Sequence, residues 1–157
     1  VLGHPTLKRQ PWQLVSWRSR LAEAQRASGA HEAALATWHA MLDDQSAPYL
    51  PQGESTARLG LAANLRALRR YDEADAQLER LIAPYDSALA SRTPAYWQAW
   101  GERLAIDLER HAGGERAGDA RARVLLRIRQ LRAQDATLGT PGTRAALEAL
   151  EARAQEK

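Results

Sequence analysis

The side chains of this 157-residue sequence that could do chemistry are mainly histidines and carboxylates. The histidines lack the spacings of a metal site, such as His-x-x-x-His, and the densest carboxylates flank expected helix ends, where capping and solvation explain them. The histidines are His4, His31, His39 and His111, and the carboxylates are Asp43, Asp44, Asp72, Glu73 and Asp75. Cysteine, a Gly-rich phosphate loop and a Ser/His/Asp arrangement are absent. We therefore expect no catalytic residue, no metal site and no cofactor.

A cluster of aromatic residues, Tyr96, Trp97 and Trp100, could form a cage for a cation or a stacking platform for a sugar. The two tryptophans, however, share one helical face with Leu104 and Leu108, which is typical of core packing. We therefore expect both tryptophans to be buried, with only Tyr96 left for the surface. Trp38 is expected to be buried as well.

The segment 121–132, RARVLLRIRQLR, is the strongest indication of nucleic-acid binding. At 100° per residue, Val124, Ile128 and Leu131 form one apolar stripe, and the arginines flank both sides of it rather than forming one basic ridge. Their aliphatic stems can cover the edges of a core. The net charge is only +3, from 22 basic and 19 acidic residues. Nucleic acid is therefore not the expected partner, and an Arg-mediated nucleic-acid-binding helical array is kept as the alternative function.

The elements that position these residues are helices, because apolar residues recur at steps of three or four and no stretch alternates as a strand would. Caps and Gly or Pro stops predict seven helices. Thr93 and Pro94 give the clearest start, and Pro84 is expected just past the end of the fourth helix. Further starts are predicted at Ser55, Asp72, Asp119 and Thr143. The first helix, near 11–28, is expected to bury Leu14, Trp17, Leu21, Ala24 and Ser28.

A repeat underlies this pattern, since shifting the chain by about 40 residues superimposes similar side chains. The pairs are Arg18 and Arg58, Leu21 and Leu61, Ala22 and Ala62, Arg26 and Arg66, and Ala34 and Ala74. A third unit follows at nearly the same spacing, with Trp97, Trp100 and Gly101 standing after Arg58, Leu61 and Ala62 in order. We predict a single domain over 1–157, with units at approximately 12–43, 55–83 and 94–135 and a capping helix at 143–156.

The repeat resembles the tetratricopeptide repeat family in residues that match its turn, aromatic, small and bulky positions. These are Gly29, His31, Ala34, Trp38 and Met41, then Tyr71, Ala74, Leu78 and Leu81, then Trp97, Trp100, Gly101 and Leu104. Arg18 and Arg58 depart from the family's usual Trp, and the closing prolines are shifted to Pro48 and Pro84. The resemblance implies an all-α, TPR-like α-solenoid of three antiparallel helix pairs plus a C-terminal capping helix. A helical hairpin array outside the family is the alternative.

The resemblance also implies a binding groove along the first helices of the units, lined by Glu23, Arg26, Leu59, Ala63, Arg66, Gln98 and Glu102. Arg26 and Arg66 occupy equivalent places on neighbouring helices, where they could grip a carboxylate or a phosphate, or only pair with Glu23 and other nearby acids. The family's carboxylate-clamp positions hold other residues here, so binding of a chaperone tail is not expected. Those positions hold Ser19, Glu23, Gly60, Ala95 and Ala99.

These patterns predict a non-catalytic protein–protein interaction scaffold that forms part of a larger polypeptide. Its expected partner is a peptide, another protein or a neighbouring domain of the same polypeptide. Insertion into a membrane is not expected, because no apolar run approaches the roughly 20 residues that cross a bilayer. The sequence begins at Val1 rather than Met, so its localisation cannot be read from its start.

Overall fold

The computed structural model describes residues 11–44, 51–86, 92–112 and 114–156, and within these ranges every regular element is an α-helix. In chain order they are α1 (Pro11–Ala27), α2 (His31–Asp43), α3 (Pro51–Ala67), α4 (Tyr71–Asp86), α5 (Pro94–Arg110), α6 (Ala117–Gln134) and α7 (Pro141–Gln155). The predicted all-α class is confirmed.

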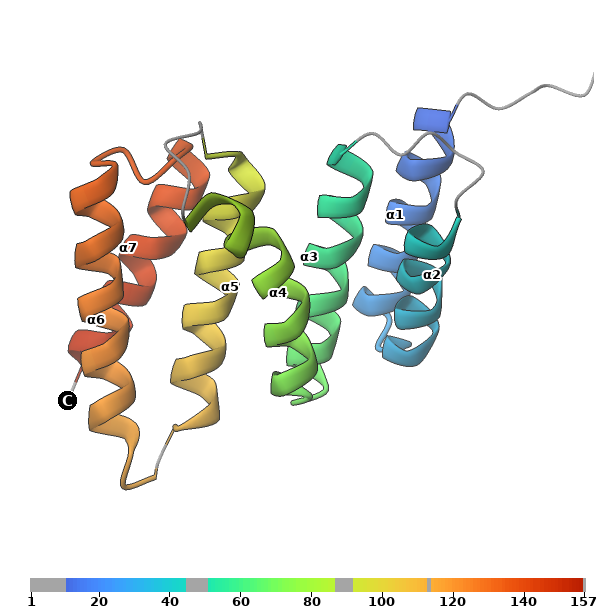
Figure 1. Ribbon diagram of the computed structural model, residues 1–157. Helices are drawn as coiled ribbons and strands as arrows, with labels where there is room; N and C mark the ends of the chain where they lie inside the picture. Colours follow the sequence, from blue (N-terminus) through green and yellow to red (C-terminus); the bar gives the residue numbers. More distant parts are fainter. Residues whose placement is uncertain (1–10, 45–50, 87–91, 113, 157) are drawn as a thin grey trace, which may run out of the picture.

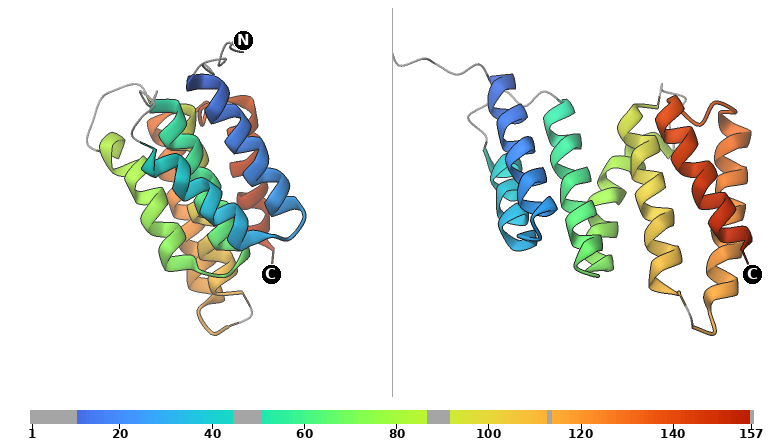
Figure 2. Two further views of the ribbon diagram at one scale, coloured as in Figure 1. Left: turned by 90° about the vertical axis from the view of Figure 1, so that its right-hand side faces the viewer. Right: turned by 180° about the vertical axis from the view of Figure 1, so that it is seen from behind.

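The helices pack against their neighbours in the chain and are laid out along one elongated molecule (Figure 1). A second set of contacts joins α1 to α3, α3 to α5, and α5 to α7. These four helices form one row, with α2, α4 and α6 behind them (Figure 2, right). Residues of α1, α3, α5 and α7 therefore share one side of the molecule although they are far apart in sequence.

Helix starts follow the predicted capping chemistry at α5 and differ from it at α7. The Thr93 side chain accepts a hydrogen bond from the Tyr96 backbone N–H at 3.4 Å, with Pro94 as the first helical residue, as predicted. For α7 the cap is Thr140 rather than Thr143. Thr143 Oγ1 accepts from the Thr140 N–H at 2.8 Å, which forms a reciprocal capping box. Both helices thus begin with the same Thr-Pro pair.

Four other predicted boundaries are wrong by a few residues. The third helix begins at Pro51 instead of after Ser55, because proline at the first helical position needs no backbone N–H. Asp72 and Asp119 lie inside the first turns of α4 and α6, where a carboxylate favours the positive end of the helix dipole. Pro84 lies within α4 rather than beyond it. The proposed closing residue Pro48 is outside the described residues.

The core contains the three tryptophans that were expected to be buried, Trp38, Trp97 and Trp100. The expectation that Tyr96 remains at the surface is wrong, because Tyr96 is only 1 % exposed. Its ring makes edge contacts with Tyr85 of α4 and with Trp97, at centroid distances of 5.9 Å and 5.2 Å. The reason is that α5 is covered by α4 as well as by α6 and α7, so it is buried on more than one face.

The predicted buried face of α1 is also wrong. Trp17 is 64 % exposed and Leu21 is 52 % exposed, and Ala24 and Ser28 are exposed beside them. The side chain of Leu14 lies outside the described residues. The inward side of α1 is instead formed by Ala22, which is fully buried, and by the half-buried Val15. Helix α1 packs on α2 and α3, and no helix of the described residues lies on its other side.

Candidate functional site

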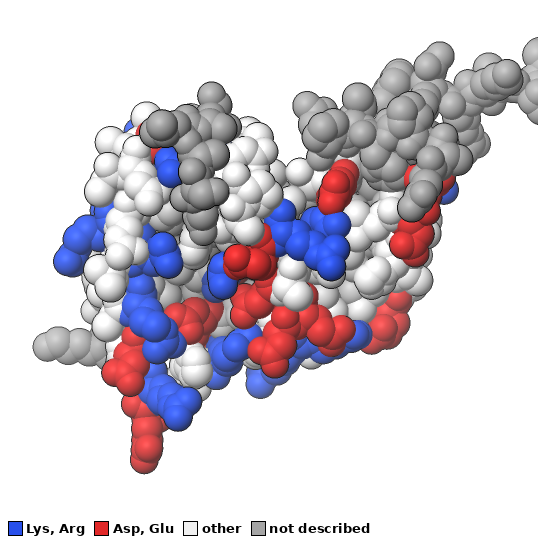
Figure 3. Space-filling view, viewed as in Figure 1, with Lys and Arg blue, Asp and Glu red and all other residues white. Residues whose placement is uncertain are grey.

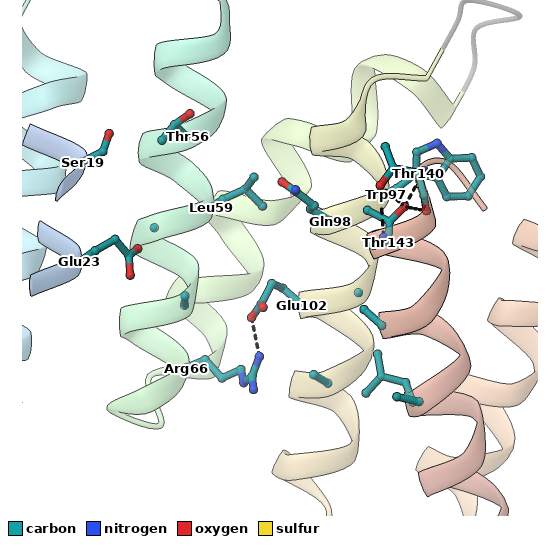
Figure 4. Close-up of a pocket in the computed structure, with 18 of the residues that line it drawn as sticks. Ser19, Glu23, Thr56, Leu59, Arg66, Trp97, Gln98, Glu102, Thr140 and Thr143 are labelled. Atoms are coloured by element: carbon teal, nitrogen blue, oxygen red, sulfur yellow. Dashed lines mark hydrogen bonds and ion pairs between the residues drawn. The ribbon is translucent and has the colours of Figure 1, made fainter. Parts of the chain in front are cut away.

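A hollow of about 700 Å³ runs along the side formed by α1, α3, α5 and α7 (Figure 4), and we refer to it as the groove. Its lining includes most of the residues predicted from the repeat alignment: Glu23, Leu59, Ala63, Arg66, Gln98 and Glu102. The remaining one, Arg26, lines an adjoining hollow of about 630 Å³ that shares Ala63, Arg66 and Glu102 with the groove. The structure therefore brings all of the predicted groove residues together on one side of the molecule.

The groove also contains residues that sequence reasoning did not place there. One wall is α7, which was expected only to cap the array and contributes, with the residue before it, Thr140, Gly142, Thr143, Ala146, Ala149, Leu150 and Arg153. The Thr-Pro start that α7 shares with α5 was the available signal, since it indicates the first helix of a further unit. Ser19, Trp38, Thr56, Gly60, Trp97, Gly101 and Ala105 complete the lining.

Most of the groove surface is apolar or carries small side chains. Gly60 lies directly over the indole of Trp38, so that a Cβ built at Gly60 would fall 2.3 Å from Trp38 Cε2. Around Gly101, by contrast, no atom other than those of its chain neighbours and its own helix backbone lies within 4 Å of a built Cβ, so the groove is open at that point. Small residues at such positions let the backbone or the side chains of a bound segment approach the helices closely.

The end of the groove near Arg66 and the adjoining hollow are charged, and Arg26 and Arg66 are already paired. Arg26 donates to Glu23 Oε2 from Nη2 at 2.8 Å and from Nε at 3.1 Å. Arg66 donates from Nη1 to Glu102 and from Nε to Glu109 Oε2 at 3.2 Å. Burial works to lower the pKa of Arg66, but the two carboxylates raise it above its ordinary value. An incoming anion would have to share or displace these carboxylates.

The opposite side of the molecule holds a second, more polar hollow of about 540 Å³ between α4, α5 and α6. Arg110 donates to Asp75 Oδ2 at 2.9 Å, and Arg123 donates to Asp107 Oδ1 at 2.8 Å. Figure 3 shows that positive and negative side chains are interspersed over this side. The arginines of the segment 121–132 therefore do not form a separate basic surface here.

Two further arginines of that segment have structural partners. The guanidinium of Arg127 stacks on the ring of Trp100 at 4.5 Å from its centroid, and Arg103 approaches the same ring at 5.4 Å. Arg132 donates from Nη2 to Glu151 Oε2 of α7 at 2.6 Å. These contacts use the charges within the fold and lower the number available to phosphate groups.

Asp75 makes the stability of the fold depend on pH in a testable way. Burial raises the pKa of Asp75 above its ordinary value of 3.8, and Arg110 only partly opposes this effect. The native state then holds the Asp75 proton more tightly than the unfolded state does. The contribution of Asp75 to stability is therefore present below about 3.8 and is lost as pH rises through its raised native pKa.

The variant Asp75→Asn cannot titrate at this position and so lacks that loss. We expect the unfolding free energy of wild type, minus that of Asp75→Asn, to fall as pH rises above about 3.8. Urea denaturation of both proteins between acidic and neutral pH measures this difference. Carboxylates with a lowered pKa, such as Glu151 beside Arg132, make the unfolding free energy rise with pH. They are present in both proteins, so their contributions cancel in the difference. A difference that stays constant or grows would contradict the assignment.

His31 and His111 have protein partners rather than converging neighbours. His31 Nδ1 lies 3.2 Å from Asn64 Oδ1, and His111 Nε2 lies 3.6 Å from Asp107 Oδ1. Within the described ranges no three His, Asp or Glu side chains are grouped so that they could hold a metal ion. His4 is outside these ranges. In the same part of the chain, none of the helices combines the length and the apolar character needed to span a membrane.

Comparison of the chain with protein-family models, with curated proteins and with solved structures gave no significant match.

Proposed function

We propose that this chain is a non-catalytic protein–protein interaction scaffold that binds a peptide or a partner domain in the groove. The observation that carries this proposal is the groove itself, an open hollow of about 700 Å³ with a largely apolar surface and one charged end. Interaction sites for extended or helical segments combine such a surface with a few polar groups at its border. The partner can equally be a neighbouring domain of the same polypeptide.

We further propose that the helices form a TPR-like α-solenoid, with α1–α2, α3–α4 and α5–α6 as its units. Support comes from the sequence repeat, which relates α1 to α3 and α3 to α5 at nearly equal spacing. These three helices also stand in one row with α7 (Figure 2, right). In such arrays the first helices of successive units line one continuous surface. Helix α7 then takes the place of the first helix of a fourth unit.

The chemistry of the groove favours a ligand of mixed character over a polyanion. Its charged end and the adjoining hollow together carry Glu23, Arg26, Arg66, Glu102 and Glu109, and both Arg26 and Arg66 already contact carboxylates. A bound segment with both charges can join this network without leaving a group unpaired, whereas a phosphate backbone would meet carboxylates as well as arginines. We therefore expect a ligand with small or apolar side chains along the groove and mixed charges at the end near Arg66.

The proposal is tested by selecting binders from a displayed library of random peptides and measuring their affinity for groove variants. Gln98→Trp and Ala149→Trp place a large ring in the groove at exposed positions on α5 and α7, so folding should be preserved. We expect either change to weaken the selected peptides by at least about tenfold, or about 1.4 kcal/mol. Arg129→Trp adds the same ring at an exposed position of α6 outside the hollows described above and should have no effect.

A salt titration of the same complexes separates this proposal from the alternative of an Arg-mediated nucleic-acid-binding array. Phosphate binding falls linearly on a log–log plot of affinity against salt, with a slope set by the number of contacts, whereas a mixed peptide interface changes less. Single- and double-stranded oligonucleotides are titrated in parallel. The scaffold proposal would be overturned by two results together. Oligonucleotides would bind tightly with a steep dependence of affinity on salt, and the affinity of the selected peptides would not change with Gln98→Trp or Ala149→Trp.

A further inference from the structure

The outward face of α1 is apolar and does not belong to the groove. Of the described residues, three large apolar side chains are more than half exposed, and two of them, Trp17 and Leu21, lie one turn apart on this helix. Ala24 and Ser28 continue the same stripe at the next steps of three and four, and both are exposed. We refer to Trp17, Leu21 and Ala24, together with Ser28 just past the end of the helix, as the outer face of α1.

The repeat shows what the same face does on α3. The alignment of the first two units places Arg20 on Gly60 and Ala24 on Asn64. Gly60 lies against the indole of Trp38 in α2, and Asn64 Oδ1 lies 3.2 Å from His31 Nδ1 at the start of α2. The outer face of α1 is thus equivalent to the face with which α3 packs against the helix before it.

The next junction repeats this relation. The alignment of the second unit with the third carries these positions to α5, where Trp17 corresponds to Tyr96 and Ala24 to Arg103. Tyr96 contacts the ring of Tyr85 in α4, and Arg103 donates to Glu79 of α4. On both α3 and α5, therefore, this face receives the preceding helix. On α1 the same face carries Trp17 and Leu21 without such a helix among the described residues.

A second copy of the chain is a poor occupant for this face. At the other end of the molecule α7 exposes Arg144, Glu148 and small residues, and no large apolar side chain on it is among the exposed ones. Head-to-tail stacking would therefore set an apolar face against a polar one. Pairing α1 with α1 would bring together two copies of Arg20, which is exposed near the middle of the helix, and their like charges would repel.

We propose that the outer face of α1 receives an amphipathic α-helix of a partner protein, which lies on α1 as α2 lies on α3 and α4 lies on α5. The received helix presents apolar side chains to Trp17 and Leu21. It also presents a carboxylate toward Arg20, because α4, the helix that α5 receives, carries the acidic partners of the arginines on α5. Glu79 of α4 pairs with Arg103, and Asp75 of α4 pairs with Arg110 at 2.9 Å.

The experiment uses a synthetic peptide with the sequence of residues 71–86, the acidic amphipathic helix α4, labelled for fluorescence anisotropy and titrated with the full chain. We expect saturable binding that Trp17→Glu and Leu21→Glu each weaken by at least about tenfold. Leu126→Glu is the matched control, because Leu126 is 53 % exposed but lies on α6. All three side chains are exposed, so circular dichroism should show unchanged thermal unfolding. A peptide with Ile82→Glu should lose binding, since Ile82 is fully buried on the same helix in the fold.

The groove variant Gln98→Trp should bind the α4 peptide as wild type does. A failure of this proposal can therefore be told apart from a failure of the proposed groove function. The absence of binding at peptide concentrations up to about 1 mM would overturn the inference. Equal binding by wild type, Trp17→Glu and Leu21→Glu would do the same. Sedimentation of the chain alone provides the remaining arm: a dimer abolished by Trp17→Glu would assign this face to a second copy instead of a partner helix.

Discussion

Replacing Trp97 by alanine is expected to lower the free energy of unfolding by about 3–5 kcal/mol, the usual cost of removing a large aromatic side chain from a core. Trp97 is 2 % exposed and packs edge-on against Tyr96. It also supports the turn before α7, because a Cβ built at Gly139 would lie 2.4 Å from Trp97 Cδ1. The substitution therefore leaves a cavity between α5 and α7 as well as lost contacts within α5.

Urea denaturation measures this cost, and hydrogen exchange shows where it acts. We expect the amides of α7 to lose protection first, since α7 lies over the vacated site. Trp17→Ala is the matched control, because Trp17 is 64 % exposed and its removal should change stability by no more than about 0.5 kcal/mol. If Trp97→Ala does not fold, Trp97→Leu keeps part of the packing and remains measurable. A cost below about 1 kcal/mol for both Trp97 variants would contradict the core assignment.

The sequence predicts burial well on α2, α4 and α6, and poorly on α1 at the end of the row and at Tyr96 on the multiply covered α5. The apolar steps of α2, α4 and α6 identify buried residues such as Met41, Ile82 and Ile128. On α1 the same periodicity selects Trp17 and Leu21, which are exposed. Periodicity locates the apolar side of a helix, but only the arrangement of the other helices decides whether that side is covered.

The predicted groove residues come from the repeat alignment and not from local chemistry. Leu59 and Gln98 stand on successive first helices, on the side away from the buried steps, and both line the groove. The role of α7 was missed because its own polar composition is that of a cap. Comparing Thr140-Pro141 with Thr93-Pro94 would have marked α7 as another first helix.

The ion pairs of the groove could not be predicted, because they depend on the register between helices. Arg66 meets Glu102 and Glu109, which are 36 and 43 residues away in the sequence. The alignment indicates that α3 and α5 are neighbours, but a shift of one turn along either helix would give Arg66 other partners. The same dependence explains why Arg123 pairs with Asp107 across α5 and α6 while Arg127 stacks on Trp100.

Replacing Gly60 by alanine is expected to change the free energy of unfolding in the opposite direction to the usual effect of this substitution inside a helix. Alanine inside a helix normally stabilises it by about 1 kcal/mol relative to glycine. At Gly60 the added Cβ would lie 2.3 Å, 2.4 Å and 2.7 Å from three ring atoms of Trp38, a buried indole with no free end to move. Overpacking of this kind typically costs about 1–3 kcal/mol, so we expect Gly60→Ala to destabilise the protein.

Gly101→Ala is the matched comparison, since Gly101 also lies inside a helix and lines the same groove, but no atom other than those of its chain neighbours and its own helix backbone lies within 4 Å of its built Cβ. We expect this variant to gain up to about 1 kcal/mol in urea denaturation while Gly60→Ala loses stability. The clash with Trp38 is then tested by a double-mutant cycle with Trp38→Leu, which removes the ring atoms concerned. In that background Gly60→Ala should become neutral or stabilising. The explanation is contradicted if the two glycine substitutions have equal effects on stability. It is also contradicted if Gly60→Ala still lowers stability in the Trp38→Leu background. Either result would show that the packing of α2 on α3 does not require glycine at position 60.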